Sequence, residues 1–155
     1  MRARRTPLLL AALVAFLVAS FLTARYLSAD TRERNLIVAL VTAQARGDET
    51  QVIRSLDGCA TAPRCVARVR ANITRLRRPG PIRIARYDSE TLHALGTARG
   101  PTRVVWLGAD RRLTTVQCVD VERTGNALRG RSILLRGLSA PIERLSSCPG
   151  QSGRP

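Results

Sequence analysis

An unbroken apolar run opens the chain. Residues 8–22 are apolar except for Ser20, and Arg2, Arg4 and Arg5 precede them. A short cationic start followed by such a run directs a chain to the export machinery. As a helix, residues 7–24 would measure about 27 Å, close to a hydrocarbon core of about 30 Å. The pattern predicts a transmembrane anchor or signal peptide within residues 1–29.

The length of the run favours a retained anchor, because cleaved signal peptides have apolar stretches of about 7–15 residues. Tyr26 suits the outer membrane interface, and the three N-terminal arginines outnumber Arg25, which keeps the N-terminus in the cytoplasm. We therefore expect a single-pass cell-membrane protein with an extracytoplasmic C-terminal domain. Cleavage is the alternative: it would follow the triplet 27–29, before Asp30, and release a secreted domain.

Three helical patterns follow the apolar run. They cover residues 30–47, 48–58 and 63–78. Asp30 and Glu33 have the spacing of a capping box, in which Asp30 begins the first helix, and Asp48 with Gln51 repeats that spacing. Pro63 suits the first turn of the third helix.

From residue 82 the hydrophobic period changes from helical spacing to two, which is typical of strands. The candidate strands are residues 82–87, 102–107, 113–123 and 132–138, with 91–95 as a short strand or a turn. Helices followed by strands with short connections predict an α+β domain over residues 30–148, with the helices packed on a curved antiparallel sheet. Residues 149–155 are rich in Ser, Gly, Pro and Arg and predict a disordered tail.

The net charge of +15 suggests an anionic partner, but the composition weakens that reading. Every basic residue is arginine and none is lysine, which is typical of a GC-rich genome. Past the N-terminal region, Tyr87 and Trp106 are the only aromatic side chains that could stack on bases. We therefore expect no nucleic-acid partner. The basic cluster of the third helix comprises Arg70, Arg75, Arg77 and Arg78. This cluster is a candidate contact for an anionic cell-wall polymer or lipid.

Four cysteines in an exported chain predict disulfides. Of the three possible pairings we favour Cys59–Cys65 with Cys118–Cys148, because the first closes a short loop and the second would hold the C-terminal segment against the sheet. A metal site that joins cysteines with His93 is disfavoured, since tight CxxC and HxxxH spacings are absent. Free buried cysteines stay an alternative.

No motif in the chain indicates catalysis. The chain has one histidine and lacks a Gly-x-Ser-x-Gly elbow, so we expect no catalytic, cofactor-binding or metal-binding residues and no cofactor. Asp120 and Glu122 share one strand face, where carboxylates more often pair with arginines than do acid–base work. Their candidate partners are Arg103, Arg131 and Arg136. The residues of a possible ligand pocket are His93, Trp106 and Asp120.

Four segments carry a resemblance to a known family. They are residues 82–89, 102–106, 116–119 and 123–126. With helices preceding them, they resemble small membrane-anchored domains of actinobacteria with a cystatin-like cone, the shape shared by nuclear-transport-factor-like proteins. The likeness covers residues 30–148. It implies a concave pocket between helices and sheet, and it implies no chemistry.

The expected function is that of a non-catalytic, membrane-anchored interaction or accessory domain in a bacterial cell envelope, with other envelope proteins as partners. One alternative is a secreted or anchored cone domain that binds a small ligand and has weak enzymatic activity. Another is an electrostatic binder of anionic cell-wall polymer or lipid.

Overall fold

The computed structural model describes residues 5–78, 80–90, 97–109, 114–126, 130–143 and 146–148, without the side chains of residues 5–9, 25–29, 126, 130 and 131. The helices are α1 (Arg5–Arg46), α2 (Glu49–Ser55), the 3-10 helix η1 (Cys59–Thr61) and α3 (Pro63–Leu76). The strands are β1 (Arg83–Ser89), β2 (Ala98–Leu107), β3 (Thr114–Asn126) and β4 (Gly130–Leu138). This order of helices before strands confirms the α+β fold.

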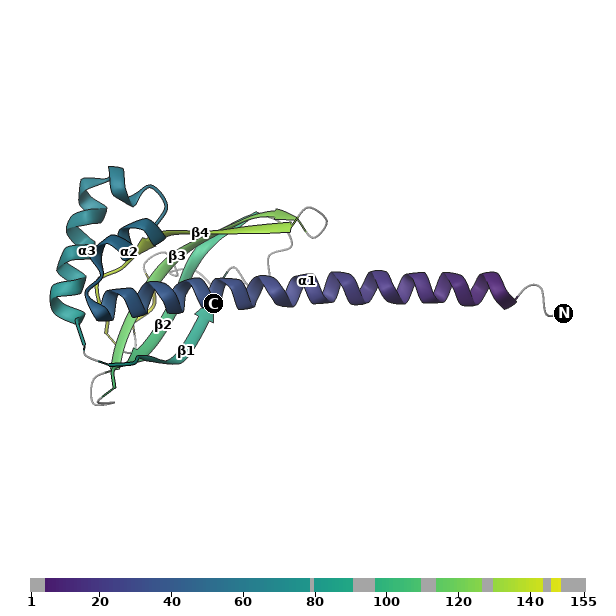
Figure 1. The fold of residues 1–155 in the computed structure, drawn as a ribbon, viewed down its shortest axis with the longest axis horizontal. Helices are drawn as coiled ribbons and strands as arrows, with labels where there is room; N and C mark the ends of the chain where they lie inside the picture. Colours follow the sequence, from purple (N-terminus) through teal and green to yellow (C-terminus); the bar gives the residue numbers. More distant parts are fainter. Residues whose placement is uncertain are drawn as a thin grey trace.

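The first helix does not begin at Asp30, so that prediction is wrong. α1 runs without a break from Arg5 to Arg46 and joins the N-terminal apolar run directly to the domain (Figure 1). Helical residues precede Asp30, so the backbone N–H groups that a capping box would bind are already bonded within the helix. The carboxylates of Asp30 and Glu33 are therefore available for contacts with the sheet.

The N-terminal part of α1 extends beyond the sheet and the other helices (Figure 1). Among the residues that the structure describes, no helix is long and apolar enough to cross a membrane. The transmembrane helix predicted over residues 7–24 is therefore not found there.

The helix boundaries after α1 agree with the local sequence. Gly47 follows α1 with a φ of +85°, a left-handed conformation that glycine adopts readily at helix ends. The side chain of Asp48 accepts a hydrogen bond from the backbone N–H of Gln51 at 2.9 Å and so caps α2, as predicted. Pro63 occupies the first turn of α3, also as predicted.

The sheet is an antiparallel meander in the order β1-β2-β3-β4. Its longest strand is β3, which the alternating pattern of residues 113–123 predicted. Irregularities in pairing occur between Ile84 and Arg86 and between Asp120 and Val121, and such bulges bend the strands that carry them. The predicted element over residues 91–95 lies outside the described residues.

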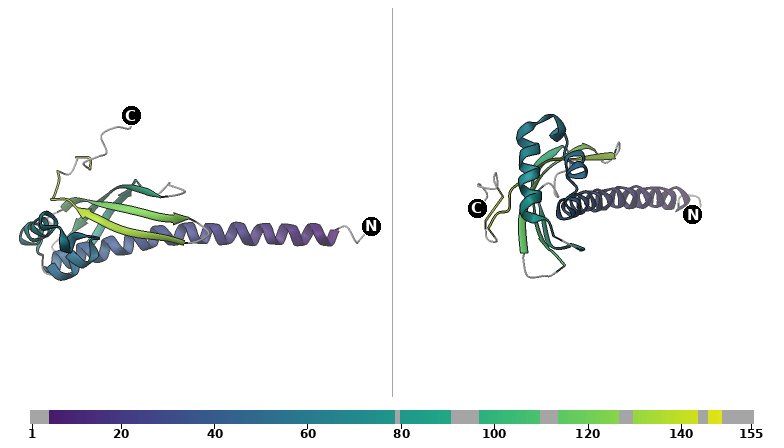
Figure 2. Two further views of the ribbon diagram at one scale, coloured as in Figure 1. Left: turned by 90° about the horizontal axis from the view of Figure 1, so that it is seen from above. Right: turned by 60° about the vertical axis from the view of Figure 1, so that its left-hand side comes forward.

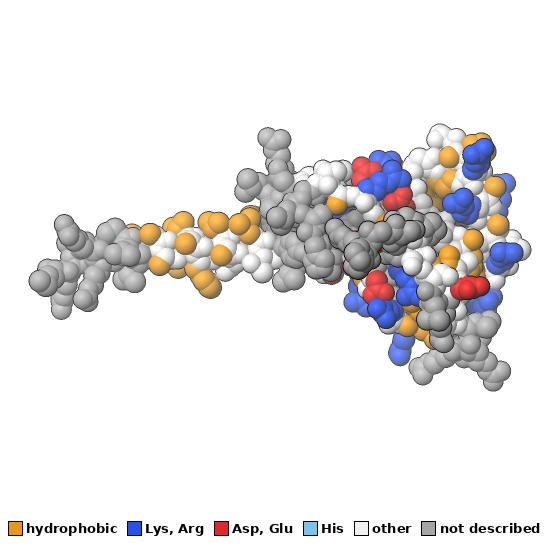
Figure 3. All heavy atoms as spheres, turned by 180° about the vertical axis from the view of Figure 1, so that it is seen from behind, with side chains coloured by type: hydrophobic (Ala, Val, Ile, Leu, Met, Phe, Trp, Pro, Cys, Tyr) orange, Lys and Arg blue, Asp and Glu red, His pale blue; other side chains and the backbone are white. Residues whose placement is uncertain are grey.

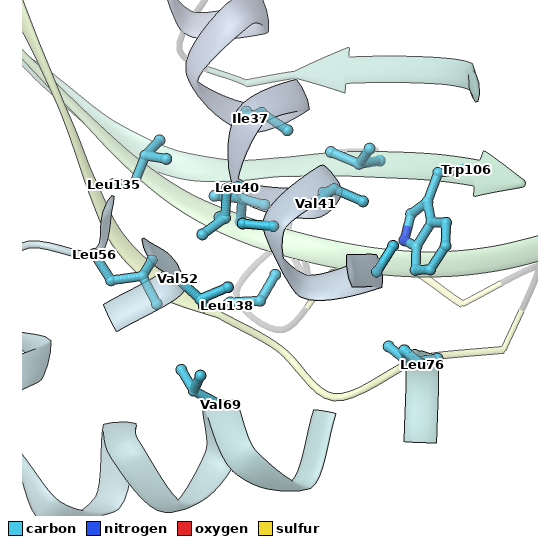
Figure 4. Packing of buried hydrophobic residues seen from close by; sticks show 14 of the residues in the cluster. Ile37, Leu40, Val41, Val52, Leu56, Val69, Leu76, Trp106, Leu135 and Leu138 are labelled. Atoms are coloured by element: carbon cyan, nitrogen blue, oxygen red, sulfur yellow. The ribbon is translucent and has the colours of Figure 1, made fainter. Parts of the chain in front are cut away.

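The hydrophobic core lies between the sheet and the C-terminal part of α1, with α2 and α3 closing one end (Figures 1 and 2). Ile37, Leu40 and Val41 of α1 are fully buried; Val41 lies on the side of the helix nearest Trp106 of β2, and Leu40 lies on the side nearest Leu135 of β4 (Figure 4). Val52, Leu56, Val69, Leu76, Leu135 and Leu138 complete the centre of this cluster. The helically spaced apolar residues of α1 and the alternating apolar residues of the strands thus pack against each other in one interface.

The C-terminal segment continues β4 along the edge of β3 and then reaches, at Cys148, the face of β3 opposite the core. The backbone N–H of Ile142 donates to the carbonyl oxygen of Val116, and that of Ser139 donates to the carbonyl oxygen of Cys118, both at 2.8 Å. A disulfide joins Cys118 to Cys148, whose exposed fraction is 1%. Both faces of β3 are buried in its first half, where Val116 and Cys118 lie on the face opposite the core.

Candidate functional site

A buried cluster of charged and hydroxyl side chains lies between α1 and the sheet. Its centre is Glu33 of α1, which is 0% exposed, beside Arg123 of β3, which is 2% exposed. Tyr87 and Ser89 reach it from β1, and Thr102 reaches it from β2. Three strands and the long helix therefore meet at one carboxylate. We call these five residues the Glu33 cluster.

Each oxygen of Glu33 accepts hydrogen bonds from the sheet. Oε1 accepts from the hydroxyls of Ser89 and Thr102, both at 2.9 Å, and from that of Tyr87. Oε2 accepts from Nε of Arg123 at 2.5 Å, while Asp30 lies 3.6 Å from Nη2 of the same guanidinium. A carboxylate that is saturated in this way and closed to solvent is a poor general base, so the cluster is suited to holding α1 against the sheet.

The ionisation of the cluster follows from these contacts. Burial alone would raise the pKa of Glu33, but hydrogen bonds from Tyr87 and Arg123 and the positive charge of Arg123 outweigh it, so the pKa is lowered. Burial and the adjacent Glu33 carboxylate raise the pKa of the Tyr87 phenol. At neutral pH, Glu33 is ionised and Tyr87 is its protonated donor.

The lowered pKa of Glu33 predicts an acid-sensitive fold. Between the pKa of Glu33 in the folded state and its ordinary value of 4.5, the unfolded chain binds more protons than the folded chain. The contribution of Glu33 to stability is therefore fully present above about pH 4.5 and is lost as the pH falls through the folded-state pKa. In urea unfolding at several pH values, Glu33→Gln should flatten this acid limb, whereas Glu143→Gln, at an exposed position, should not. Equal acid limbs in the wild type and Glu33→Gln would contradict the assignment.

The structure does not bring the predicted pocket residues together. Trp106 is buried on the core face of β2, where its Nε1 donates to Oε1 of Gln117 at 3.0 Å. Asp120 lies on the opposite face of the sheet and pairs with Arg99 at 2.6 Å. His93 lies outside the described residues. Trp106 instead belongs to a buried network in which the Gln44 and Gln117 amides bond one another.

The carboxylates of β3 pair with arginines, as predicted, although only one partner was foreseen. Glu122 accepts from Nε of Arg136 at 2.7 Å, in agreement with the prediction, and Asp120 pairs with Arg99 of β2. Arg103 lies 3.7 Å from Asp88 instead, and the side chain of Arg131 is outside the description. These carboxylates have the role of cross-strand ion-pair partners.

The predicted basic cluster of the third helix divides in the structure. Nε of Arg70 lies 2.7 Å from Oε1 of Glu49, so its charge is compensated. The side chain of Arg77 packs over Gly47, in the turn after α1. A Cβ atom at Gly47 would lie 3.2 Å from Nε of Arg77. Arg78 bends back toward the end of α3, where Nη1 donates to the carbonyl oxygens of Arg77 at 3.0 Å and of Arg75 at 3.4 Å. Arg75 is exposed.

Both predicted disulfide pairings are present. Cys59 is joined to Cys65 with a Cα–Cα distance of 5.3 Å, and Cys118 is joined to Cys148 with a Cα–Cα distance of 5.7 Å. The first ties η1 to the start of α3, and the second ties β3 to the C-terminal segment. All four cysteines are therefore used in covalent cross-links.

An open hollow of about 550 Å³ lies where α1 passes β4. Arg32, Asn35 and Leu36 line it from α1, and Ser132 and Ile133 line it from β4. This hollow is separate from the predicted pocket residues. Its lining has a single charged side chain and no carboxylate or histidine, so the described residues present no acid–base pair to a ligand there.

The sequence interpretation missed the Glu33 cluster, although one pattern indicated it. Gln117, Val119 and Val121 alternate on the core face of β3, and the next position in that alternation is Arg123. A guanidinium at a core position requires a buried anion. The partner could not be chosen from the sequence, because Glu33 fits a helix cap equally well.

Comparisons with protein families, curated proteins and solved structures found no match to this chain. The resemblance to cystatin-like cone domains therefore stays a prediction.

Proposed function

We propose that this chain is a non-catalytic interaction or accessory domain of a bacterial cell envelope. The apolar N-terminal part of α1 holds it at the cell membrane, and the α+β domain works on the extracytoplasmic side. The observation that carries the proposal is the continuity of α1 from an exposed apolar segment into the core of the domain.

The apolar segment of α1 is suited to lipid. Its large side chains are exposed, with Leu10 at 60%, Phe16 at 68% and Phe21 at 55%. Apart from Ser20, leucines, valines and alanines fill the positions between them, so the described segment is apolar around the helix; Figure 3 shows the apolar side chains on one of its sides. A single partner helix would cover one stripe of such a surface, whereas lipid covers the entire circumference.

The disulfides support the extracytoplasmic side. Cross-links of this kind form and persist in oxidising environments and are rare in the bacterial cytosol. The arginines before the apolar run favour a cytoplasmic N-terminus, which supports an extracytoplasmic domain. The saturated Glu33 carboxylate supports a non-catalytic role, since the most buried acid of the described chain is occupied by structural contacts.

Membrane fractionation followed by N-terminal mass spectrometry tests the proposal. The native chain should remain with the membranes after a high-salt wash, dissolve in detergent and retain its N-terminal residues. Its cysteines should react with a maleimide after reduction and not before. A soluble product that begins at Asp30 would overturn the membrane attachment and favour the secreted alternative. A full-length cytosolic product with four reactive thiols would overturn the proposal as a whole.

A matched pair of substitutions separates the apolar segment from the domain. Leu17→Arg places a charge in the exposed apolar segment, where a charge in lipid costs about 2.5–3.5 kcal/mol, and should move the protein toward the soluble fraction. Leu36→Arg places the same charge at an exposed apolar position of the domain, and should leave the distribution unchanged. Equal distributions for the two variants would show that the segment does not act through lipid.

A further inference from the structure

Three arginines of α3 form a row on the outside of the domain. Successive helical residues turn by about 100°, so Arg64, Arg68 and Arg75 lie within about 40° of one another and span about 16 Å along the helix. All three are exposed, and in the described part of the chain none has a carboxylate within ion-pair distance. We call these residues the arginine row.

The buried residues of α3 fix the direction of the row. Val69, Asn72 and Leu76 are buried and face the rest of the domain. The amide of Asn72 donates to the carbonyl oxygen of Ser139 at 2.9 Å, which prevents rotation of the helix about its axis. The row lies to one side of this buried face and is open to solvent. Ala71 lies between Arg68 and Arg75 along the helix, within about 60° of each member of the row, and is exposed and short, so it leaves the row open to an extended chain.

The position of α3 excludes contact with the membrane that holds α1. α3 lies at the end of the domain opposite the N-terminus (Figures 1 and 2), where the backbone N–H of Arg78 donates to the carbonyl oxygen of Ala45 at 2.8 Å. From Leu22 to Ala45, α1 measures about 35 Å. Because the Debye length is about 8 Å at physiological ionic strength, headgroup charge is screened at that distance.

We propose that the arginine row binds a linear polymer of the envelope that carries repeated phosphate groups and lies away from the bilayer surface. Guanidinium groups bind phosphate with two parallel hydrogen bonds, and a row of them matches a repeating anion better than a single one. Figure 3 shows basic side chains predominating at this end of the domain. The row has no aromatic side chain for base stacking, which favours such a polymer over single-stranded nucleic acid. The location of this polymer rests on the proposed function; the binding itself does not.

Binding of the full-length protein in nonionic detergent to long-chain inorganic polyphosphate tests the proposal. The row variant is Arg64→Gln with Arg68→Gln and Arg75→Gln, and the matched control is Arg32→Gln with Arg34→Gln and Arg83→Gln, which removes the same charge from exposed positions. The row variant should bind at least tenfold more weakly than the control. The slope of log affinity against log salt concentration should be smaller in magnitude by about 2 for the row variant than for the control, because each of the three lost phosphate contacts lowers it by about 0.7.

Three outcomes would overturn the proposal. Equal losses in the two variants would show that net charge alone determines binding. Tighter binding of a single-stranded oligonucleotide, with the same dependence on the row, would make nucleic acid the partner. Attachment of full-length protein to phosphatidylglycerol vesicles that is lost in the row variant would make lipid the partner. Fractionation of the native chain is independent of these variants, so failure of the proposed function and failure of this site are distinguishable.

Discussion

Replacing Arg123 with methionine is expected to lower the free energy of unfolding by about 3–5 kcal/mol, the largest effect of any single substitution predicted for this domain. Methionine fills a similar volume and removes the charge. Glu33 would then be left as a buried carboxylate with three hydroxyl donors and no cation. Urea unfolding followed by circular dichroism measures the change.

A rescue variant and a control make this result specific. Adding Glu33→Gln to Arg123→Met removes the uncompensated charge and keeps an oxygen for the three hydroxyls, so it should recover more than half of the lost stability. Arg86→Met breaks the exposed pair with Asp88, and should have a much smaller effect, since exposed pairs exchange with water at little cost. If Arg123→Met unfolds at the wild-type urea concentration, the Glu33 cluster does not hold α1 to the sheet.

Removal of the disulfide between Cys118 and Cys148 is expected to destabilise the domain by about 3.5 kcal/mol, from the entropy of the 30-residue loop that it closes. The C-terminal segment would then lose its covalent link to β3 and keep its hydrogen bonds to Val116, Gln117 and Cys118. Replacement of both cysteines by alanine, with urea unfolding, measures the loss. Limited proteolysis should also show faster cleavage between Ser139 and Cys148.

The second disulfide is the matched control. Cys59 and Cys65 are 6 residues apart, so the same relation predicts a loss of about 2 kcal/mol when both are replaced by alanine. Proteolysis of the C-terminal segment should be unchanged in this variant. A larger loss for the pair Cys59 and Cys65 than for Cys118 and Cys148 would contradict the view that the C-terminal segment is held mainly by its cross-link.

Elements with local determinants were predicted from the sequence. Asp48 caps α2 through a backbone N–H three residues away, and Pro63 begins α3, because both effects act within one helical turn. The alternation over residues 113–123 predicted β3 and its two faces, since successive side chains of a strand point to opposite sides. The cysteine pairings agreed as well, because few pairings were open to four residues.

Elements that depend on distant partners were not predicted from the sequence. The spacing of Asp30 and Glu33 is that of a helix cap. Glu33 is 90 residues from Arg123, so the local sequence around Glu33 does not identify Arg123 as its partner. Similarly, Trp106 and Asp120 looked like neighbours in a pocket, and their positions on opposite faces of the sheet became evident once strand register was known.

The sequence alone determined the α+β class, most helix and strand positions, the cysteine pairing and an apolar N-terminal segment behind arginines. Each depends on periodicity, capping or spacing within a short stretch of chain. The tertiary structure decided that α1 is a single helix, that Glu33 is buried with Arg123, and that Arg64, Arg68 and Arg75 are the uncompensated arginines of α3. These features depend on which segments pack together, and burial and ion pairing are properties of that packing rather than of local sequence.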